Sequence, residues 1–260
     1  MEWITIAHAF SGLLIGTLVG LTGVGGGSLM TPLLTLAFGI RADIAIGTDL
    51  MFAGLTKCVG VATHRQHGHV HWRIVALLSL GSVPAAIATL IVMRHLDLTG
   101  GGQSVYLKYG IALSLLLTVV ALFARPRIAA VLQARRPNSV ARAEPRLATV
   151  AAGALIGMLV SSTSIGAGAI GATLILMLYP SLRSRELAGT DIAFAVPITL
   201  IAGAGHAWLG TVDWTLLAGL LLGSTPGIAL GTRLSRALPE QWTRAVLATM
   251  LGLVAIKLVS

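Results

Sequence analysis

Long apolar stretches, separated by short polar or glycine-rich stretches, run along the whole chain. A helix needs about 20 mainly apolar residues to cross the roughly 30 Å hydrocarbon core of a bilayer. Most of the stretches approach this length, so the pattern predicts an all-α integral membrane protein. The ten predicted segments are Ile4–Leu21, Ser28–Phe38, Ile44–Thr63, Trp72–Met93, Val105–Ala124, Leu147–Ser162, Ala167–Tyr179, Leu187–Ala207, Trp214–Thr232 and Trp242–Val259.

The second and seventh segments are shorter than the others. They contain about 11 and 13 residues, which at 1.5 Å per residue does not span the hydrocarbon core. Each follows a glycine-rich stretch that weakens a helix, Thr22–Ser28 in the first half and Thr163–Ala169 in the second. We expect two short helices that follow broken backbone, or re-entrant hairpins.

The two halves of the chain match each other. An offset of 141 residues superimposes the first glycine-rich stretch on the second. After a one-residue insertion the offset becomes 142, and it then pairs Gly47-Thr48-Asp49 with Gly189-Thr190-Asp191. The same offset pairs His64 with His206 and Trp72 with Trp214. Matched Asp, His and Trp are not a consequence of apolar composition, so we interpret the chain as two repeats.

Basic residues predict the orientation of the segments. The stretch Arg125–Arg146 holds six arginines and one acidic residue, and its prolines argue against a continuous helix. Because cytoplasmic loops carry an excess of Lys and Arg, we place this linker in the cytoplasm. Thirteen of the 18 basic residues then fall on the cytoplasmic side and four on the other, with both termini outside.

The segment count predicts the relation between the repeats. Each repeat holds five segments, an odd number, so the second copy enters the membrane upside down, as in many secondary transporters. We therefore expect one membrane domain with a first repeat at 1–124, a basic cytoplasmic linker at 125–146 and a second repeat at 147–260.

Composition excludes several classes of protein. Apolar residues make up 55% of the chain and charged residues 10%, against ~25% charged in an average soluble domain. This excludes a soluble enzyme, a disordered chain and a nucleic-acid-binding module. One cysteine, Cys58, permits no internal disulfide and no thiolate metal cluster. No nucleophile–base–acid set or metal-ligand motif is evident, so we expect neither an enzyme nor a cofactor.

The two glycine-rich breaks are the candidate binding elements. Backbone N–H groups freed inside a bilayer need protein, water or ligand partners, and a helix that starts after such a break directs its positive dipole end at it. Such an end binds anions. The alternative interpretation is that the glycines only allow close helix packing. The candidate substrate-binding residues are Thr22, Gly25, Gly26, Gly27 and Ser28 in the first break, and Thr163, Ser164, Gly166 and Gly168 in the second.

The repeated Gly-Thr-Asp at the predicted start of the third and eighth segments has two interpretations. Thr and Asp are good helix caps, and Asp in a first turn suits the helix dipole. Alternatively, Thr48 and Thr190 donate hydroxyls to the substrate while Asp49 and Asp191 bind protons or cations. Both roles would be copied with the repeat.

Other ionisable residues are candidates for coupling or gating. Lys57 lies inside a predicted segment, where it either extends to the cytoplasmic interface or helps to neutralise an anion. Its counterpart is Thr199, so this charge is not repeated. The matched pair His64 and His206 suggests gates or proton carriers, or simply interfacial histidines. The histidine run at 64–71 has no helical metal-ligand spacing and no accompanying carboxylate or thiol, so we assign no metal to it.

The order of motifs resembles the TauE/SafE family of sulfite exporters. The resemblance rests on a glycine-rich break, a short apolar segment, Gly-Thr-Asp and Gly-Ser-x-Pro, repeated twice. Its most specific part is Gly16-x-x-x-Gly20-x-x-Gly23-x-Gly25-Gly26-Gly27-Ser28, followed by Thr31-Pro32. The second break departs from it, with Ala167 and Ala169 in place of Gly26 and Ser28. The resemblance implies multi-pass transport of small sulfur-containing anions.

These observations predict a secondary transporter in the cytoplasmic (inner) membrane. We expect it to export sulfite, sulfoacetate or a related oxyanion by alternating access, with the lipid bilayer and the anion as partners, protons or sodium as candidate coupling ions, and no nucleic acid. The alternative is a multi-pass scaffold or assembly factor without transport. That alternative would explain the composition, but not two opposed breaks with hydroxyl groups.

Overall fold

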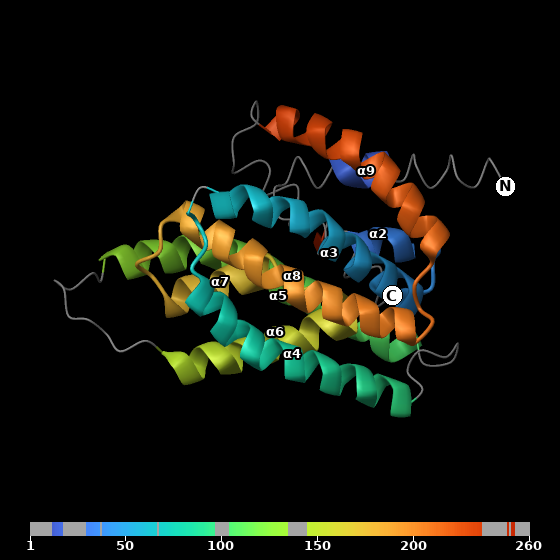
Figure 1. Cartoon of the computed structure of the whole chain (residues 1–260), viewed down its shortest axis with the longest axis horizontal. Helices are drawn as coiled ribbons and strands as arrows, with labels where there is room; N and C mark the ends of the chain where they lie inside the picture. The colour runs from blue at the N-terminus through green and yellow to red at the C-terminus, as the bar shows by residue number, and fades with distance from the viewer. Residues whose placement is uncertain are drawn as a thin grey trace.

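The computed structural model describes residues 12–17, 30–36, 38–66, 68–96, 104–134, 145–235, 249 and 251–252. Every regular element in these ranges is a helix (Figure 1). Residues 12–17 are helical, and eight labelled helices follow: α2 (Met30–Leu36), α3 (Ala42–Gln66), α4 (Trp72–His95), α5 (Ser104–Ala134), α6 (Arg146–Thr163), α7 (Ala169–Leu178), α8 (Ser184–Trp208) and α9 (Trp214–Ser235).

Five of the described helices are long and apolar enough to cross a membrane: α4, most of α5, α6, α8 and α9. The prediction of an all-α protein with several membrane-spanning helices is confirmed. The short seventh segment is also confirmed, because α7 has ten residues and spans only ~15 Å at 1.5 Å per residue. Helix α2 has seven residues, and those before Met30 in the predicted second segment lie outside the described ranges.

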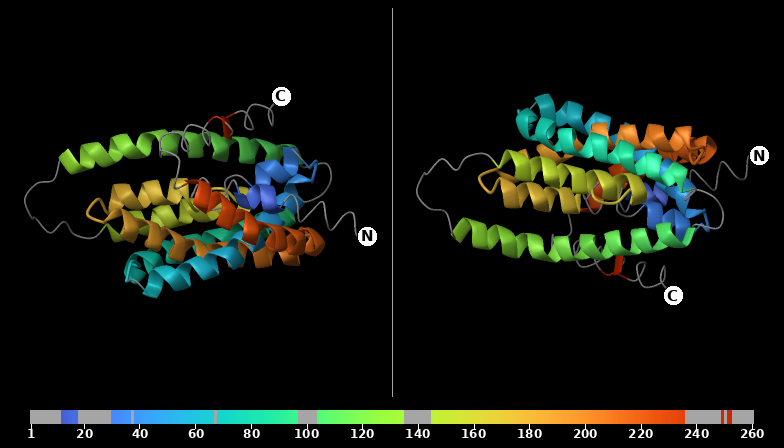
Figure 2. Two further views of the ribbon diagram at one scale, coloured as in Figure 1. Left: turned by 90° about the horizontal axis from the view of Figure 1, so that it is seen from above. Right: turned by 90° about the horizontal axis from the view of Figure 1, so that it is seen from below.

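The helices run side by side, with α3 and α8 packed together in the centre (Figures 1 and 2). On one side of this pair α4 packs against α6, and on the other side residues 12–17 pack against α9. Helices α5 and α7 pack against each other. Close approach depends on glycine at these contacts: a Cβ atom at Gly16 would lie 2.6 Å from the Ser224 carbonyl oxygen, and one at Gly157 would meet the Ser82 carbonyl oxygen.

Contacts between the halves come in reciprocal pairs. The Thr48 hydroxyl accepts a hydrogen bond from the Asp213 N–H, and the Thr190 hydroxyl accepts one from the His71 N–H, both at 3.1 Å. Adding the sequence offset of 142 to one pair gives the other. Gly16–Ser224 and Gly157–Ser82 are related in the same way, through the offsets of 141 and 142. An exchange of this kind is what a two-fold relation between two repeats produces.

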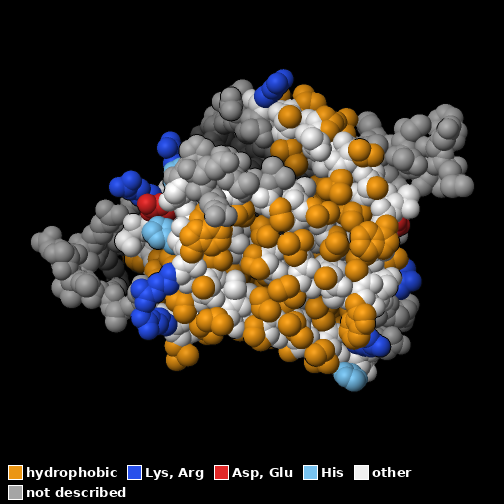
Figure 3. Space-filling view, viewed as in Figure 1, with side chains coloured by type: hydrophobic (Ala, Val, Ile, Leu, Met, Phe, Trp, Pro, Cys, Tyr) orange, Lys and Arg blue, Asp and Glu red, His pale blue; other side chains and the backbone are white. Residues whose placement is uncertain are grey.

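Large apolar side chains cover the outside of the helices as well as the inside. Leu80 on α4 and its counterpart Leu222 on α9 are 65% and 70% exposed. Figure 3 shows hydrophobic side chains across the middle of this face and basic side chains at its two ends. Trp72 and Trp214, at the first residues of α4 and α9, are both exposed. This distribution suits a lipid-facing surface with aromatic side chains at its borders.

Two sequence expectations about helix ends are wrong. Gly-Thr-Asp does not cap α3 or α8, because α3 begins at Ala42 and α8 at Ser184, about a full turn or more before Thr48 and Thr190. Pro126 does not keep the start of the predicted linker from being helical, since α5 continues through it to Ala134. A proline inside a helix removes one backbone hydrogen bond, and neighbouring groups at a helix end can compensate for it.

Candidate functional site

The second glycine-rich break separates α6 from α7 inside the protein. Helix α6 ends at Thr163, and Ser164 then adopts a left-handed conformation with φ of 59°. Gly166 has φ of 136°, in the region that favours glycine, and α7 begins at Ala169. Thr163 and Ser164 are buried, with 2% and 5% of their surface exposed. The predicted break is therefore real, and it lies in the interior.

Several backbone N–H groups of this break do not take part in the hydrogen bonds of the helix. The first hydrogen bonds of α7 are donated by the N–H of Gly171 to the Gly166 carbonyl and by the N–H of Ala172 to the Gly168 carbonyl. None of the hydrogen bonds between described residues uses the N–H groups of residues 167–170. Four successive donors at a helix N-terminus are a suitable environment for an anion.

Asp49 joins the first repeat to this break. Its Oδ2 atom accepts hydrogen bonds from the Thr31 hydroxyl at 2.6 Å and from the Ser164 hydroxyl at 2.9 Å. Thr31 lies in the first turn of α2, and Asp49 is fully buried on α3. One carboxylate thus holds together the start of the first short helix and the start of the second break.

Lys57 reaches the same break from the next part of α3. Its Nζ atom donates to the Ala167 carbonyl at 3.1 Å. The side chain is partly buried and is within electrostatic reach of Asp49 and Asp191. The structure therefore favours the interpretation in which Lys57 supplies positive charge at the break over extension to the cytoplasmic interface.

Asp191 lies beside the first turn of α7. Its side chain is 8% exposed, and Oδ1 has no hydrogen-bond partner within the described part of the chain. Gly171 leaves the space for it, because a Cβ atom there would lie 2.7 Å from Oδ1. The structure thus places Asp49, Lys57 and Asp191 around the second break, and their coupling role stays a prediction.

Three of the predicted substrate-binding hydroxyls make hydrogen bonds within the protein. Thr48 and Thr190 are fully buried and accept the backbone hydrogen bonds between the halves described above. The Thr163 hydroxyl donates to the Leu159 carbonyl at 2.6 Å and accepts from the Ile165 N–H at 3.2 Å. These contacts position the break. A direct contact of Thr48, Thr163 or Thr190 with substrate stays a prediction.

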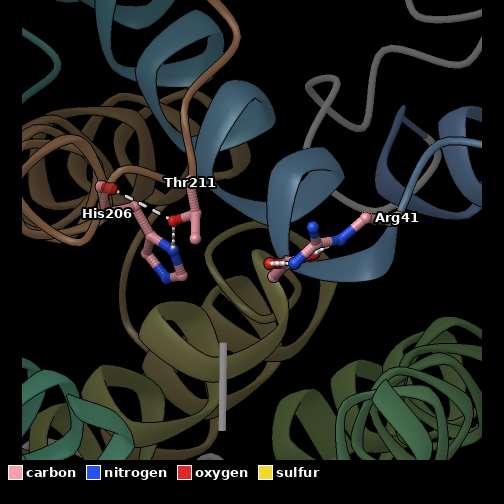
Figure 4. A network of polar contacts seen from close by, with 4 residues as sticks. Arg41, His206 and Thr211 are labelled. Carbon is pink, nitrogen blue, oxygen red and sulfur yellow. Dashed lines mark hydrogen bonds and ion pairs between the residues drawn. The ribbon is translucent and has the colours of Figure 1, made fainter. Parts of the chain in front are cut away.

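His206 lies near the end of α8 and contacts the last turn of α6, just before the second break. Its Nδ1 atom is 2.8 Å from the Thr211 hydroxyl, and its Nε2 atom is 2.9 Å from the Ser161 carbonyl. Figure 4 shows His206 and Thr211 pointing toward each other, with Arg41 nearby in its ion pair with Asp43. His206 is fully buried in the last turn of α8. The gating role of His206 stays a prediction.

Several predicted site residues lie outside the described part of the chain. They are the whole first break, namely Thr22, Gly25, Gly26, Gly27 and Ser28. The backbone of His64 is helical within α3, but its side chain lies outside the described set. The predicted meeting of the two breaks therefore stays a prediction, supported by the joint contact of Thr31 and Ser164 with Asp49.

Sequence reasoning did not single out two residues of the site. Thr31 was noted only as part of the Thr-Pro that follows the first break, although it is the nearest hydroxyl to Asp49. Gly171 was not noted at all. A glycine one turn into a short apolar helix was the available signal, since glycine in a helix often marks a close approach.

Comparisons with known proteins agree with this architecture. The family model described as "Sulfite exporter TauE/SafE" matches residues 8–258. The chain belongs to the TauE/SafE family. It is 32% identical over 98% of its length to the full length of the "Probable membrane transporter protein YjnA" of Bacillus subtilis. It is 28% identical to a "Probable membrane transporter protein" of Xylella fastidiosa, over 95% of this chain and 90% of that protein. No solved structure matches the chain.

Membership in the TauE/SafE family confirms the family resemblance and the class. The chain is a multi-pass membrane protein of a transporter family, with its matched region covering both halves and the residues between them. The second break, Asp49, Lys57 and Asp191 all lie within that region.

Proposed function

We propose that this TauE/SafE protein is a secondary transporter that exports small sulfur-containing anions, such as sulfite or sulfoacetate, across the cytoplasmic membrane. The observation that carries the proposal is the second break. Its backbone N–H groups at residues 167–170 lie next to the Lys57 ammonium, in the buried interior between α6 and α7. Backbone donors and a helix dipole end suit a compact oxyanion, and they need little reorganisation when it binds.

The membrane potential supplies the direction of transport. An inside-negative potential of 100 mV favours outward movement by ~2.3 kcal/mol for each negative charge. A sulfite dianion would leave the cell along this gradient without another ion. Export therefore requires a pathway and a site, and the break provides the site.

Alternating access is the mechanism that we propose for the pathway. The reciprocal contacts, Thr48–Asp213 and Thr190–His71 among them, support an inverted relation between a first repeat at 1–124 and a second at 147–260. Asp49–Ser164 and Lys57–Ala167 are contacts between these repeats at the break. Rocking of one repeat against the other would expose the break to each side in turn.

We further propose that the linker at 125–146 faces the cytoplasm and both termini face outside, in the inner membrane. A single cysteine at Asn138, in a Cys58→Ser background, is expected to react with an impermeant maleimide in inside-out vesicles. Right-side-out vesicles should leave it unlabelled until they are permeabilised. Labelling in intact right-side-out vesicles would reverse the proposed orientation.

The proposed function is tested by flux. Purified protein in liposomes loaded with labelled sulfite is expected to release it at least ten times faster than protein-free liposomes, and faster still under an inside-negative potential. The same assay with sulfoacetate compares the two anions. Release no faster than from protein-free liposomes, for both anions, would favour the alternative of a membrane scaffold.

A further inference from the structure

The two aspartates that match in sequence have different surroundings in the structure. Asp49 accepts two side-chain hydrogen bonds at Oδ2, from Thr31 and Ser164, while its Oδ1 has no partner. Asp191 accepts none from the described side chains, although it is also buried. Hydrogen bonds to a charged group are stronger than those between neutral groups, so Asp49 is held in place and Asp191 is not.

The sequence explains this difference. The offset of 141 places Gly23 opposite Ser164, so the first repeat has no hydroxyl group at the corresponding position. Thr173 is a hydroxyl residue on the helix that faces Asp191, but it donates to the Ala169 carbonyl at 2.7 Å instead. Both repeats hold the carboxylate, but among the described residues only Asp49 has side-chain donors.

Two oxygen acceptors lie near Gly171, namely Asp191 Oδ1 and the Gly166 carbonyl oxygen. The position that a Cβ atom of Gly171 would occupy is 2.7 Å from Asp191 Oδ1 and 3.4 Å from the Gly166 carbonyl oxygen. That carbonyl accepts the N–H of Gly171 and has a second lone pair. A proton on Asp191 would turn its carboxylate into a hydrogen-bond donor, and the Gly166 carbonyl is an acceptor beside the same glycine.

Charged groups around Asp191 come from two neighbouring helices. Lys57 on α3 and Arg125 on α5 are within electrostatic reach of it, and Asp49 faces the same lysine. Helix α7 contributes no titratable residue, and α6 contributes only Arg146 at its first position. The titratable residues of α4 are Arg73, Arg94 and His95, at its two ends. Asp191 is thus the negative group next to the N–H groups that would bind the anion.

We propose that Asp191 takes up a proton when the anion binds at the second break, whereas Asp49 keeps the break in position. The inference rests on the proposed anion site. The Asp191 carboxylate beside the first turn of α7 and an anion at the N–H groups of that turn repel each other. Binding of the anion therefore favours the protonated carboxyl, and by linkage the proton favours the anion. The proton comes from a hydronium ion of the solvent: one O–H bond of that ion breaks, a new O–H bond forms at a carboxylate oxygen of Asp191, and a water molecule is left.

The test counts protons. Sulfite binding to the purified full-length protein is measured calorimetrically over a pH series, in pairs of buffers with different ionisation enthalpies, for the wild type and for Asp191→Asn. The protonation of sulfite itself is the same in both titrations. We expect the wild type to take up about one more proton per sulfite than Asp191→Asn at the pH of maximum difference. Equal uptake by the two proteins would overturn the proposal.

Asp49→Asn is the matched control, because it removes the equivalent charge from the other repeat. It should retain the additional proton and should lower the melting temperature, whereas Asp191→Asn should melt within about 2 °C of the wild type, since it loses no hydrogen bond. The proposal would be overturned if Asp49→Asn, and not Asp191→Asn, lost the additional proton. It would also be overturned if sulfite binding depended on sodium and took up no proton.

A failure of the inference about Asp191 can be distinguished from a failure of the proposed function. If the wild type binds no sulfite, the proposed function fails, and the melting comparison still tests whether Asp191 lacks a structural partner. An Asp191→Asn protein that is destabilised as much as Asp49→Asn, or that does not fold, would contradict the inference directly.

Discussion

Asp49→Ala is expected to abolish sulfite transport and to lower the free energy of unfolding by about 3–6 kcal/mol, from two lost hydrogen bonds to a charged group at ~1.5–3 kcal/mol each. The substitution also leaves the hydroxyls of Thr31 and Ser164 buried without this acceptor, and it separates α2 from the second break. Thermal unfolding in detergent and flux in liposomes measure the two effects.

Asp213→Ala is the control for that substitution. Asp213 also accepts two hydrogen bonds at one oxygen, from the N–H groups of Thr215 and Leu216, each at 2.9 Å. It is exposed at the start of α9, where loss of a helix cap costs ~0.5–2 kcal/mol. If Asp49→Ala costs no more than Asp213→Ala, Asp49 does not hold the break.

Gly166→Ala is expected to reduce sulfite flux at least tenfold. Gly166 has φ of 136°, and a Cβ atom there would lie 3.3 Å from the Val160 side chain. A backbone forced into this region costs ~1–3 kcal/mol, which the break can relieve only by turning its N–H groups away from their present direction. Flux under a fixed potential, normalised to protein reconstituted, measures the loss.

A matched glycine separates strain from loss of the site. Gly210, between α8 and α9, has φ of 73°, and a Cβ atom there would meet nothing within 4 Å. Gly210→Ala therefore introduces backbone strain at a positive φ away from the break, and it should lower stability while retaining flux. Equal loss of flux in both variants would mean that the break has no special role in binding.

The sequence determined which parts of the chain form helices and which helix is too short to span. Transfer of an apolar stretch into lipid depends on about 20 consecutive residues, so a local pattern carries the information. This applies to α4, α6, α8 and α9, and equally to α7, whose ten residues follow a run of glycine and hydroxyl residues. The internal offset also placed Asp49 and Asp191 in corresponding positions.

Helix ends were less well determined. Ala42 and Asp43 precede the apolar part of α3, and Pro126 follows that of α5, so hydropathy places both ends inside the true helices. A polar helical turn beyond the hydrocarbon is stabilised by backbone hydrogen bonds and packing. The hydrophobic pattern does not record either contribution.

Only the tertiary structure decided which partner each buried charge has. Asp49 and Ser164 are 115 residues apart, and Lys57 and Ala167 are 110 apart, so no local pattern relates them. Among the described residues, the same packing gave two hydroxyl donors to Asp49 and none to Asp191, although the repeat made the two aspartates equivalent. Burial in lipid is a property of each segment by itself, whereas a hydrogen bond depends on the relative placement of two segments to within an ångström.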